Sequence, residues 1–214
     1  MRSKNMDQTT ENRFPRVILA SASPRRLDLL RQVGIEPEVE PSHVEEVITS
    51  TVPDQVVMEL SRQKAEDIAA LHTGEDAIVI GADTVVAYDG KILGKPKDEA
   101  DAVRMIRSFQ GKVHQVYTGV TLVFCGKAAE NAAEQWKTIT FAEKTEVFVC
   151  SMTEQQIEDY VKTGEPMDKA GAYGIQGRFA VWVKGISGDY NNVVGLPLGR
   201  VCRELLGISR QENV

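Results

Sequence analysis

The sequence predicts an α/β fold in which helices flank a mixed β-sheet. Segments with the apolar spacing of helices interleave along the whole chain with short segments that have the spacing of strands. The run Ala77–Ile80 is apolar at every position and suits a central strand buried on both faces. The pair Asp89 and Gly90, between TVVAY and KIL, predicts a tight hairpin turn. These three observations together give the fold class.

The first elements are predicted to be a strand and two helices. Arg16–Ala20 reads as a short buried strand, and Ser23 followed by Pro24 predicts the start of a helix that Gly34 ends. A longer amphipathic helix is expected over 53–71. The inner faces of the two helices are expected to consist of Leu27, Leu30 and Val33, and of Val57, Leu60, Ile68 and Leu71.

The remaining elements continue the same alternation. Further helices are expected over 98–109, 153–164 and 198–206, and further strands over 116–124, 138–150 and 178–184. Thr153 and Gln156 have the spacing of a capping box. The segment GKAAENAAEQW is expected to be a loop or a variable insertion.

Composition excludes several classes of protein. The 214 residues fit one domain, expected over 15–208 after a disordered polar tail at 1–14. A formal net charge of −6 argues against a general nucleic-acid binder, which needs an excess of Lys and Arg. No segment has the apolar length of a membrane span or a signal-peptide core, so we expect no membrane role and a cytoplasmic location. The residues Cys125, Cys150, Cys202, His43, His72 and His114 show no metal-ligand spacing and are expected to be structural.

The octamer LASASPRR is the first candidate for an anion site. The N-terminus of a helix carries unsatisfied N–H groups, and Ser21 and Ser23 add hydroxyl donors there. Arg25 and Arg26 supply guanidinium groups whose geometry matches phosphate or carboxylate. The alternative is a capped helix with solvated arginines, and the octamer by itself does not decide between them.

Two further charged residues stand at positions that are otherwise apolar. Lys64 falls within the apolar stripe of the helix at 53–71, which favours an ammonium that projects into a cleft over one that reaches past the sheet edge. Asp83 follows the buried run, where open α/β sheets place ligand sites, and Gly81 is expected to allow a ligand to approach closely. Thr84 could orient a substrate or a water molecule. The alternative for Asp83 is an ordinary turn residue.

Other polar residues complete a candidate set for phosphoryl or nucleotidyl chemistry. Lys95 follows the hairpin, and Glu45 or Glu46 could hold a divalent cation. Because no nucleophilic serine or cysteine with a base is evident, direct attack by water is the expected mechanism. The segment EPMDKAGAYGIQG places Asp168, Lys169 and Gln176 among small residues, so its backbone could approach a ligand while the Gln176 amide reads a base. A crowded packing turn is the alternative.

The motifs LASASPRR, GADTVV, LGKPKD and EPMDKAGAYGIQG, in this order, resemble the Maf family of nucleoside triphosphate pyrophosphatases. The resemblance runs from about Val17 to Leu206. It implies a two-lobed fold of the inosine-triphosphatase type, with a curved mixed sheet and a deep central cleft. It also implies hydrolysis of a nucleoside triphosphate to the monophosphate and pyrophosphate, a divalent metal cofactor such as Mg²⁺ or Mn²⁺, and a homodimer.

The resemblance assigns roles to the candidate residues. Asp83 matches the proton acceptor for the attacking water. Glu46 matches the acidic position that handles the metal together with Asp83. The neighbouring Glu45 leaves this alignment open by one residue. The positions that match substrate-binding residues are Ser21, Ser23, Arg26, Lys64 and Lys95, to which the sequence adds Asp168 and Lys169.

Substrate choice is also implied by the resemblance. Arg25, Thr84 and Gln176 match the positions that mark the dTTP and UTP subgroup, which makes these nucleotides the expected substrates. The alternatives are a 7-methyl-GTP pyrophosphatase and a nucleotide-sensing regulator of cell division and septum formation.

Overall fold

The computed structural model describes residues 14, 16–126 and 136–207. The helices are α1 (Pro24–Gln32), α2 (Pro53–Ala69), α3 (Glu99–Phe109), α4 (Glu154–Val161), α5 (Tyr190–Val194) and α6 (Leu198–Leu205). The strands are β1 (Val17–Leu19), β2 (Glu38–Val39), β3 (Ile78–Tyr88), β4 (Lys91–Leu93), β5 (Val113–Phe124), β6 (Lys137–Val149) and β7 (Val183–Ser187). The expected tail at 1–14, except residue 14, and most of the expected loop at 126–136 lie outside the described residues.

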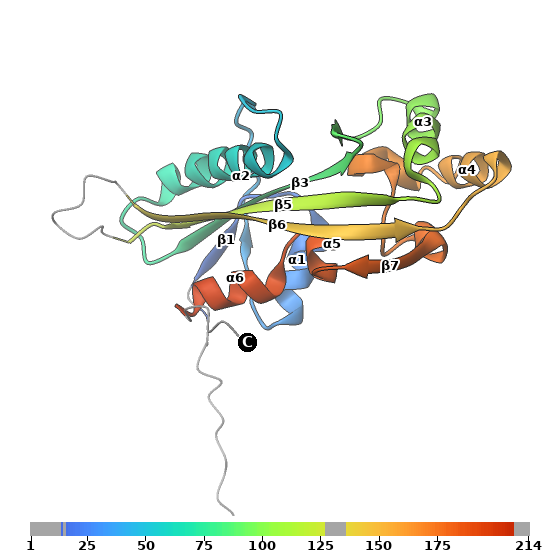
Figure 1. Cartoon of the computed structure of the whole chain (residues 1–214). Helices are drawn as coiled ribbons and strands as arrows, with labels where there is room; N and C mark the ends of the chain where they lie inside the picture. The colour runs from blue at the N-terminus through green and yellow to red at the C-terminus, as the bar shows by residue number, and fades with distance from the viewer. Residues whose placement is uncertain (1–13, 15, 127–135, 208–214) are drawn as a thin grey trace, which may run out of the picture.

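One mixed sheet organises the fold, as the sequence predicts. Within the described residues it has seven strands in the order β2-β1-β3-β5-β6-β7, with β4 paired to β3. β1 is parallel to β2 and β3, whereas β3, β5, β6 and β7 pair antiparallel. Helix α2 lies over one face of the sheet, and α1, α5 and α6 lie over the other (Figure 1). The α/β class with flanking helices is therefore confirmed.

Strand β3 is longer than the sequence suggests. It runs without a break from Ile78 to Tyr88 through Gly81, and Asp89 and Gly90 then turn it into β4 with φ angles of 51° and 70°. Both predicted parts of the hairpin are present. Asp83 therefore lies in the middle of a strand and not at its end, which corrects the sequence-based expectation.

Two glycines allow α2 to lie directly on the sheet. A Cβ atom at Gly81 would lie 2.2 Å from the Ser61 carbonyl oxygen, and one at Gly119 would lie 2.2 Å from the Val57 carbonyl oxygen. Real Cβ atoms do not approach so closely, so only glycine fits at either position. The expectation that Gly81 admits a ligand is wrong, because the backbone of α2 occupies that space.

Several predicted helices have the expected ends and faces. Asp98 caps α3 by accepting a hydrogen bond from the Asp101 amide, and Thr153 and Gln156 form a complete capping box at α4. The expected inner face of α2 is correct for Val57, Leu60 and Ile68. Leu71 is 70% exposed, contrary to expectation, because α2 ends at Ala69 and the 3-10 turn Ala70–His72 follows it.

The expected strand over 178–184 is largely wrong. Arg178–Trp182 forms a 3-10 turn, and β7 begins only at Val183. The buried ring of Phe179 packs among the rings of Tyr160, Tyr173 and Trp182. The packing of Phe179 in this aromatic cluster outweighs the alternating pattern of the segment. Helix α5 was not predicted.

Candidate active site

A cleft opens where one edge of β3 has no partner strand among the described residues. On this edge β1 pairs with β3 only as far as Ile80, and β4 begins to pair only at Val86. Consecutive strand residues point to opposite faces of a sheet. Because the edge is open between the two partners, Asp83 and Thr84 both reach the cleft, although they start from opposite faces.

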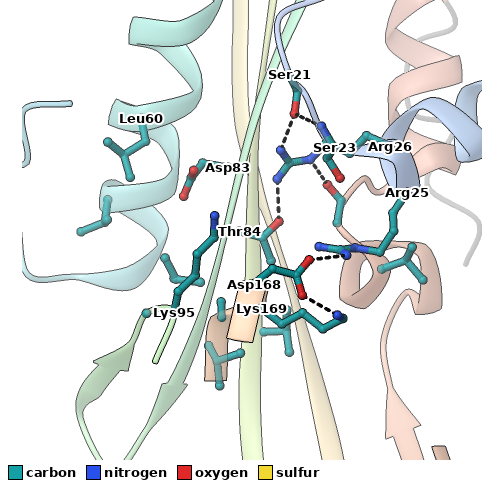
Figure 2. Close-up of a pocket in the computed structure, with 18 of the residues that line it drawn as sticks. Ser21, Ser23, Arg25, Arg26, Leu60, Asp83, Thr84, Lys95, Asp168 and Lys169 are labelled. Carbon is teal, nitrogen blue, oxygen red and sulfur yellow. Dashed lines mark hydrogen bonds and ion pairs between the residues drawn. The ribbon is translucent and has the colours of Figure 1, made fainter. Parts of the chain in front are cut away.

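The cleft has a volume of about 1100 Å³ and brings together every candidate residue except Glu45, the alternative to Glu46. They come from α1 and the residues before it, the segment between β2 and α2, α2 itself, β3, the segment after β4, and the turns at 165–177. The candidate residues that line it are Ser21, Ser23, Arg25, Arg26, Glu46, Lys64, Asp83, Thr84, Lys95, Asp168, Lys169 and Gln176. Residues from widely separated parts of the chain thus share one space, as Figure 2 shows for most of them.

On the α2 side of the cleft, one ammonium joins two carboxylates. Lys64 Nζ lies 2.6 Å from Asp83 Oδ1 and 2.8 Å from Glu46 Oε1. The Lys64 and Asp83 side chains are only 18% and 16% exposed, so water screens their interaction weakly. Lys64 projects into the cleft, as its position in the apolar stripe suggested. Of the two neighbouring glutamates that the sequence left open, Glu46 is the one that pairs with Lys64.

Glu46 is held in place by a loop that sequence reasoning missed. Residues 40–52 have no regular structure, yet three side chains that are successive turns apart on α2 bind them. The pairs are Thr49 with Glu59, Val47 with Gln63, and Ser42 with Asp67. The polar residues at this spacing in the helix were the available sequence signal. The loop also brings His43 to the cleft, although the sequence suggested no role for it there.

On the opposite side, Arg26 is fixed by three hydrogen bonds. Its Nε donates to the Gly195 carbonyl at 2.8 Å, Nη1 to Ser21 Oγ at 2.9 Å, and Nη2 to Thr84 Oγ1 at 3.1 Å. Burial lowers the pKa of Arg26 from its ordinary value, and the charge of Asp83 opposes this shift. A guanidinium remains charged nevertheless and has five N–H groups, so two remain for a ligand.

The residues around the start of α1 differ in one respect from the expectation. Ser23 is the N-cap residue and Pro24 follows it, but the Ser23 side chain makes no capping hydrogen bond. Its amide instead donates to Ser21 Oγ at 3.3 Å. The Ser23 hydroxyl is therefore not used by the helix and is left to line the cleft.

Near the turns at 165–172, Asp168 joins two cations. It lies 2.6 Å from Lys169 Nζ and 3.5 Å from Arg25 Nη1, and Lys169 Nζ also donates to the Glu165 carbonyl at 2.7 Å. Burial alone would raise the pKa of Asp168, but the hydrogen bond from Lys169 and the charge of Arg25 outweigh it and lower the pKa. In this geometry Asp168 holds cationic side chains and is not itself aimed at an anionic ligand.

Lys95 and Gln176 are more exposed members of the cleft lining. Figure 2 shows the Lys95 side chain extending toward Asp83. The cleft thus combines a carboxylate on β3 with cations from four segments of the chain, which is the charge pattern that a polyphosphate requires.

The donor set fits a divalent cation that enters with a phosphate ligand. Among the described residues, no group of three or more His, Cys, Asp or Glu side chains could hold a metal alone. Mg²⁺, however, is commonly bound by one or two carboxylates together with phosphate oxygens of the substrate. Glu46 and Asp83 offer two carboxylates, and the Lys64 ammonium between them shows that this place accepts positive charge.

No helix in the described part of the chain has the length and apolar composition to cross a membrane.

Comparison with known proteins bears on the whole chain. The sequence model of the family described as Maf-like protein matches residues 16–208. Proteins named dTTP/UTP pyrophosphatase are similar to the chain: one from Agathobacter rectalis is 56% identical over 88% of this chain and 95% of its own length. Those from Lachnoclostridium phytofermentans and Bacillus cytotoxicus are 48% and 50% identical, over 88% of this chain and 93% of their lengths.

Among solved structures, the Staphylococcus aureus Ham1 protein aligns over 63% of this chain and 72% of its own, with 13% identity and a TM-score of 0.43. The family match spans the motifs that line the cleft, and the relatives are aligned over nearly their full lengths. On that evidence this chain belongs to the Maf family.

Proposed function

We propose that this chain hydrolyses dTTP and UTP to the nucleoside monophosphate and pyrophosphate. The observation that carries the proposal is the convergence of Arg26, Lys64 and Lys95 on one cleft that also contains Asp83. The relatives named dTTP/UTP pyrophosphatase support the choice of substrate. The proposal includes residues 15–208 as one catalytic domain, a cytoplasmic location and a homodimer.

In this mechanism Asp83 accepts a proton from the water molecule that attacks the α-phosphorus. A bond forms between the water oxygen and the α-phosphorus, the bond from that phosphorus to the α,β-bridging oxygen breaks, and pyrophosphate leaves. Lys64 and Lys95 neutralise the charge that develops on the leaving group, and the two uncommitted N–H groups of Arg26 bind a phosphate. Lys64 must release at least part of its contact with Asp83 to do so.

Glu46 and Asp83 would hold a divalent cation, which when bound supplies charge neutralisation and polarises the phosphate oxygens. Ser21 and Ser23 add hydroxyl groups to the phosphate path. Asp168 contributes through its ion pairs, by holding Arg25 and Lys169 in position for the substrate. Arg25, Thr84 and Gln176 recognise the base, with the Gln176 amide able to donate and to accept a hydrogen bond.

The test is pyrophosphate release by the purified full chain across a panel of nucleoside triphosphates. Mg²⁺ and Mn²⁺ are compared, and the panel includes dTTP, UTP, CTP, GTP, ATP and 7-methyl-GTP. We expect the highest kcat/KM for dTTP and UTP, and little release after chelation of divalent cations. Highest activity on 7-methyl-GTP would contradict the assignment, and tight nucleotide binding without release would indicate a sensor instead.

A further inference from the structure

A chain of hydrogen bonds leads from the cleft into the core of the protein. Arg26 Nη2 donates to Thr84 Oγ1 at 3.1 Å, Thr84 Oγ1 lies 2.9 Å from Thr118 Oγ1, and Thr118 Oγ1 lies 2.9 Å from the Asn192 carbonyl oxygen. Thr84 and Thr118 are directly paired across β3 and β5. Thr118 is fully buried and does not line the cleft.

The direction of each hydrogen bond follows from the chemistry of the groups. A carbonyl oxygen can only accept, so the single hydroxyl proton of Thr118 is committed to Asn192. Thr118 can then only accept in its contact with Thr84, so the Thr84 proton points to Thr118 and away from the cleft. The Thr84 oxygen therefore faces the cleft as an acceptor. One lone pair of this oxygen accepts the hydrogen bond from Arg26, and the other remains available to a ligand.

The main-chain carbonyl of Asn192, which sets this direction, is itself rigidly held. Asn192 Nδ2 donates to the Val116 carbonyl at 3.1 Å and to Thr145 Oγ1 at 3.0 Å, and Asn192 is fully buried. Thr145 Oγ1 also donates to the Asp189 carbonyl at 2.9 Å. These bonds fix α5 against β5 and β6, so the carbonyl cannot turn away to release the Thr118 proton.

We propose that Thr118 is a positioning residue that determines base selectivity through Thr84. By keeping the Thr84 hydroxyl an acceptor, Thr118 favours thymine and uracil, whose N3 carries a proton, over cytosine, whose N3 is an acceptor. With cytosine, the Thr84 oxygen would face the N3 acceptor, and both groups would be desolvated without a hydrogen bond. Such a mismatch weakens binding strongly. The inference rests on the proposed function, and in particular on Thr84 as a base-contacting residue.

The test compares kcat/KM for UTP and CTP in the wild-type protein and in Thr118→Val. Valine keeps the shape of threonine but gives Thr84 no acceptor, so the Thr84 proton becomes free to turn toward the cleft. We expect the ratio of UTP to CTP to fall about tenfold, mainly through KM, and Thr118→Ser to restore it. Thr121→Val is the matched control, because Thr121 is also fully buried on β5 but bonds Ser61 and Thr140.

The outcomes separate this inference from the proposed function. A wild-type protein that releases pyrophosphate from neither dTTP nor UTP refutes the function itself. If the wild type hydrolyses UTP, then an unchanged ratio in folded Thr118→Val or an equal fall in Thr121→Val overturns only the role of Thr118. A wild type with no preference for UTP over CTP overturns both that role and the assignment of dTTP and UTP as the preferred substrates. If Thr118→Val does not fold, Thr84→Val decides: the inference requires its ratio to fall, and an unchanged ratio overturns it.

Discussion

The two walls of the cleft meet at consecutive residues of β3 but hold their side chains by different means. On the α2 side, Asp83, Lys64 and Glu46 are joined by ion pairs that a ligand can rearrange. On the α1 and α5 side, Thr84 and Arg26 belong to a hydrogen-bond chain that continues into the core. One strand can therefore supply reactive and preorganised groups together, provided that its edge is open.

The largest expected effect comes from a change at Asp83, in the ion-paired group on the α2 side of the cleft. Asp83→Asn keeps the size of the side chain but removes the proton acceptor, so we expect kcat to fall about a thousandfold while the fold remains intact. Pyrophosphate release and thermal unfolding measure the two quantities. A variant that retains most of its turnover would show that Asp83 is not the base.

A smaller effect is expected from a change at Arg26, in the hydrogen-bonded group on the α1 and α5 side of the cleft. Arg26→Lys keeps the charge, but an ammonium cannot reproduce a planar group that reaches Gly195, Ser21 and Thr84 at once. We expect kcat/KM to fall about 30-fold, on the scale of about 2 kcal/mol for charge-assisted hydrogen bonds. Arg31→Lys is the control, because Arg31 lies on the same helix and pairs with Glu36 outside the cleft. Equal losses in both variants would contradict the role of Arg26.

The smallest effect concerns the free energy of unfolding, and it separates the stability of the whole fold from the chemistry of the cleft. His114 is buried, and its Nε2 lies 2.8 Å from the Tyr173 hydroxyl, while its Nδ1 has no hydrogen-bond partner among the described residues. Burial lowers its pKa from 6.5 to about 4. Between these values the unfolded chain binds the proton more readily than the folded one, so stability is complete above the unfolded pKa and decreases as the pH falls.

We therefore expect the free energy of unfolding to lose up to about 1.4 kcal/mol per pH unit below pH 6.5 through His114. Denaturant unfolding between pH 6.5 and about pH 5, where carboxylates are still largely ionised, measures the slope. His114→Gln should flatten it. An unchanged slope would rule out His114 as the titrating group, and any loss of activity without loss of stability would then belong to the cleft.

Local sequence patterns predicted most elements because their causes are local. The hairpin at Asp89 and Gly90, the cap at Asp98 and the capping box at Thr153 each depend on residues a few positions apart. The strand predicted over 178–184 was wrong for the opposite reason: Arg178–Trp182 forms a 3-10 turn, in which Phe179 is held by rings from distant segments. Tertiary packing decided that segment.

The same distinction applies to the site. Side-chain chemistry and motif spacing singled out the candidate residues, and all of them except Glu45, the alternative to Glu46, line the cleft. The sequence could not show that Asp83 lies in mid-strand, because that depends on where β1 and β4 stop pairing with β3. Nor could it show that Thr118 pairs with Thr84, because strand register is fixed by the assembled sheet.

The bare backbone contact of α2 with Gly81 and Gly119 has a consequence for how this protein can change. No layer of side chains separates helix from strands there, so nothing in between can absorb a displacement of the helix. A shift of α2 would also move the backbone of Lys64 relative to Asp83. A side chain introduced at either glycine would therefore act on the ion pair of Lys64 with Asp83 from a distance, by displacing the helix that carries Lys64.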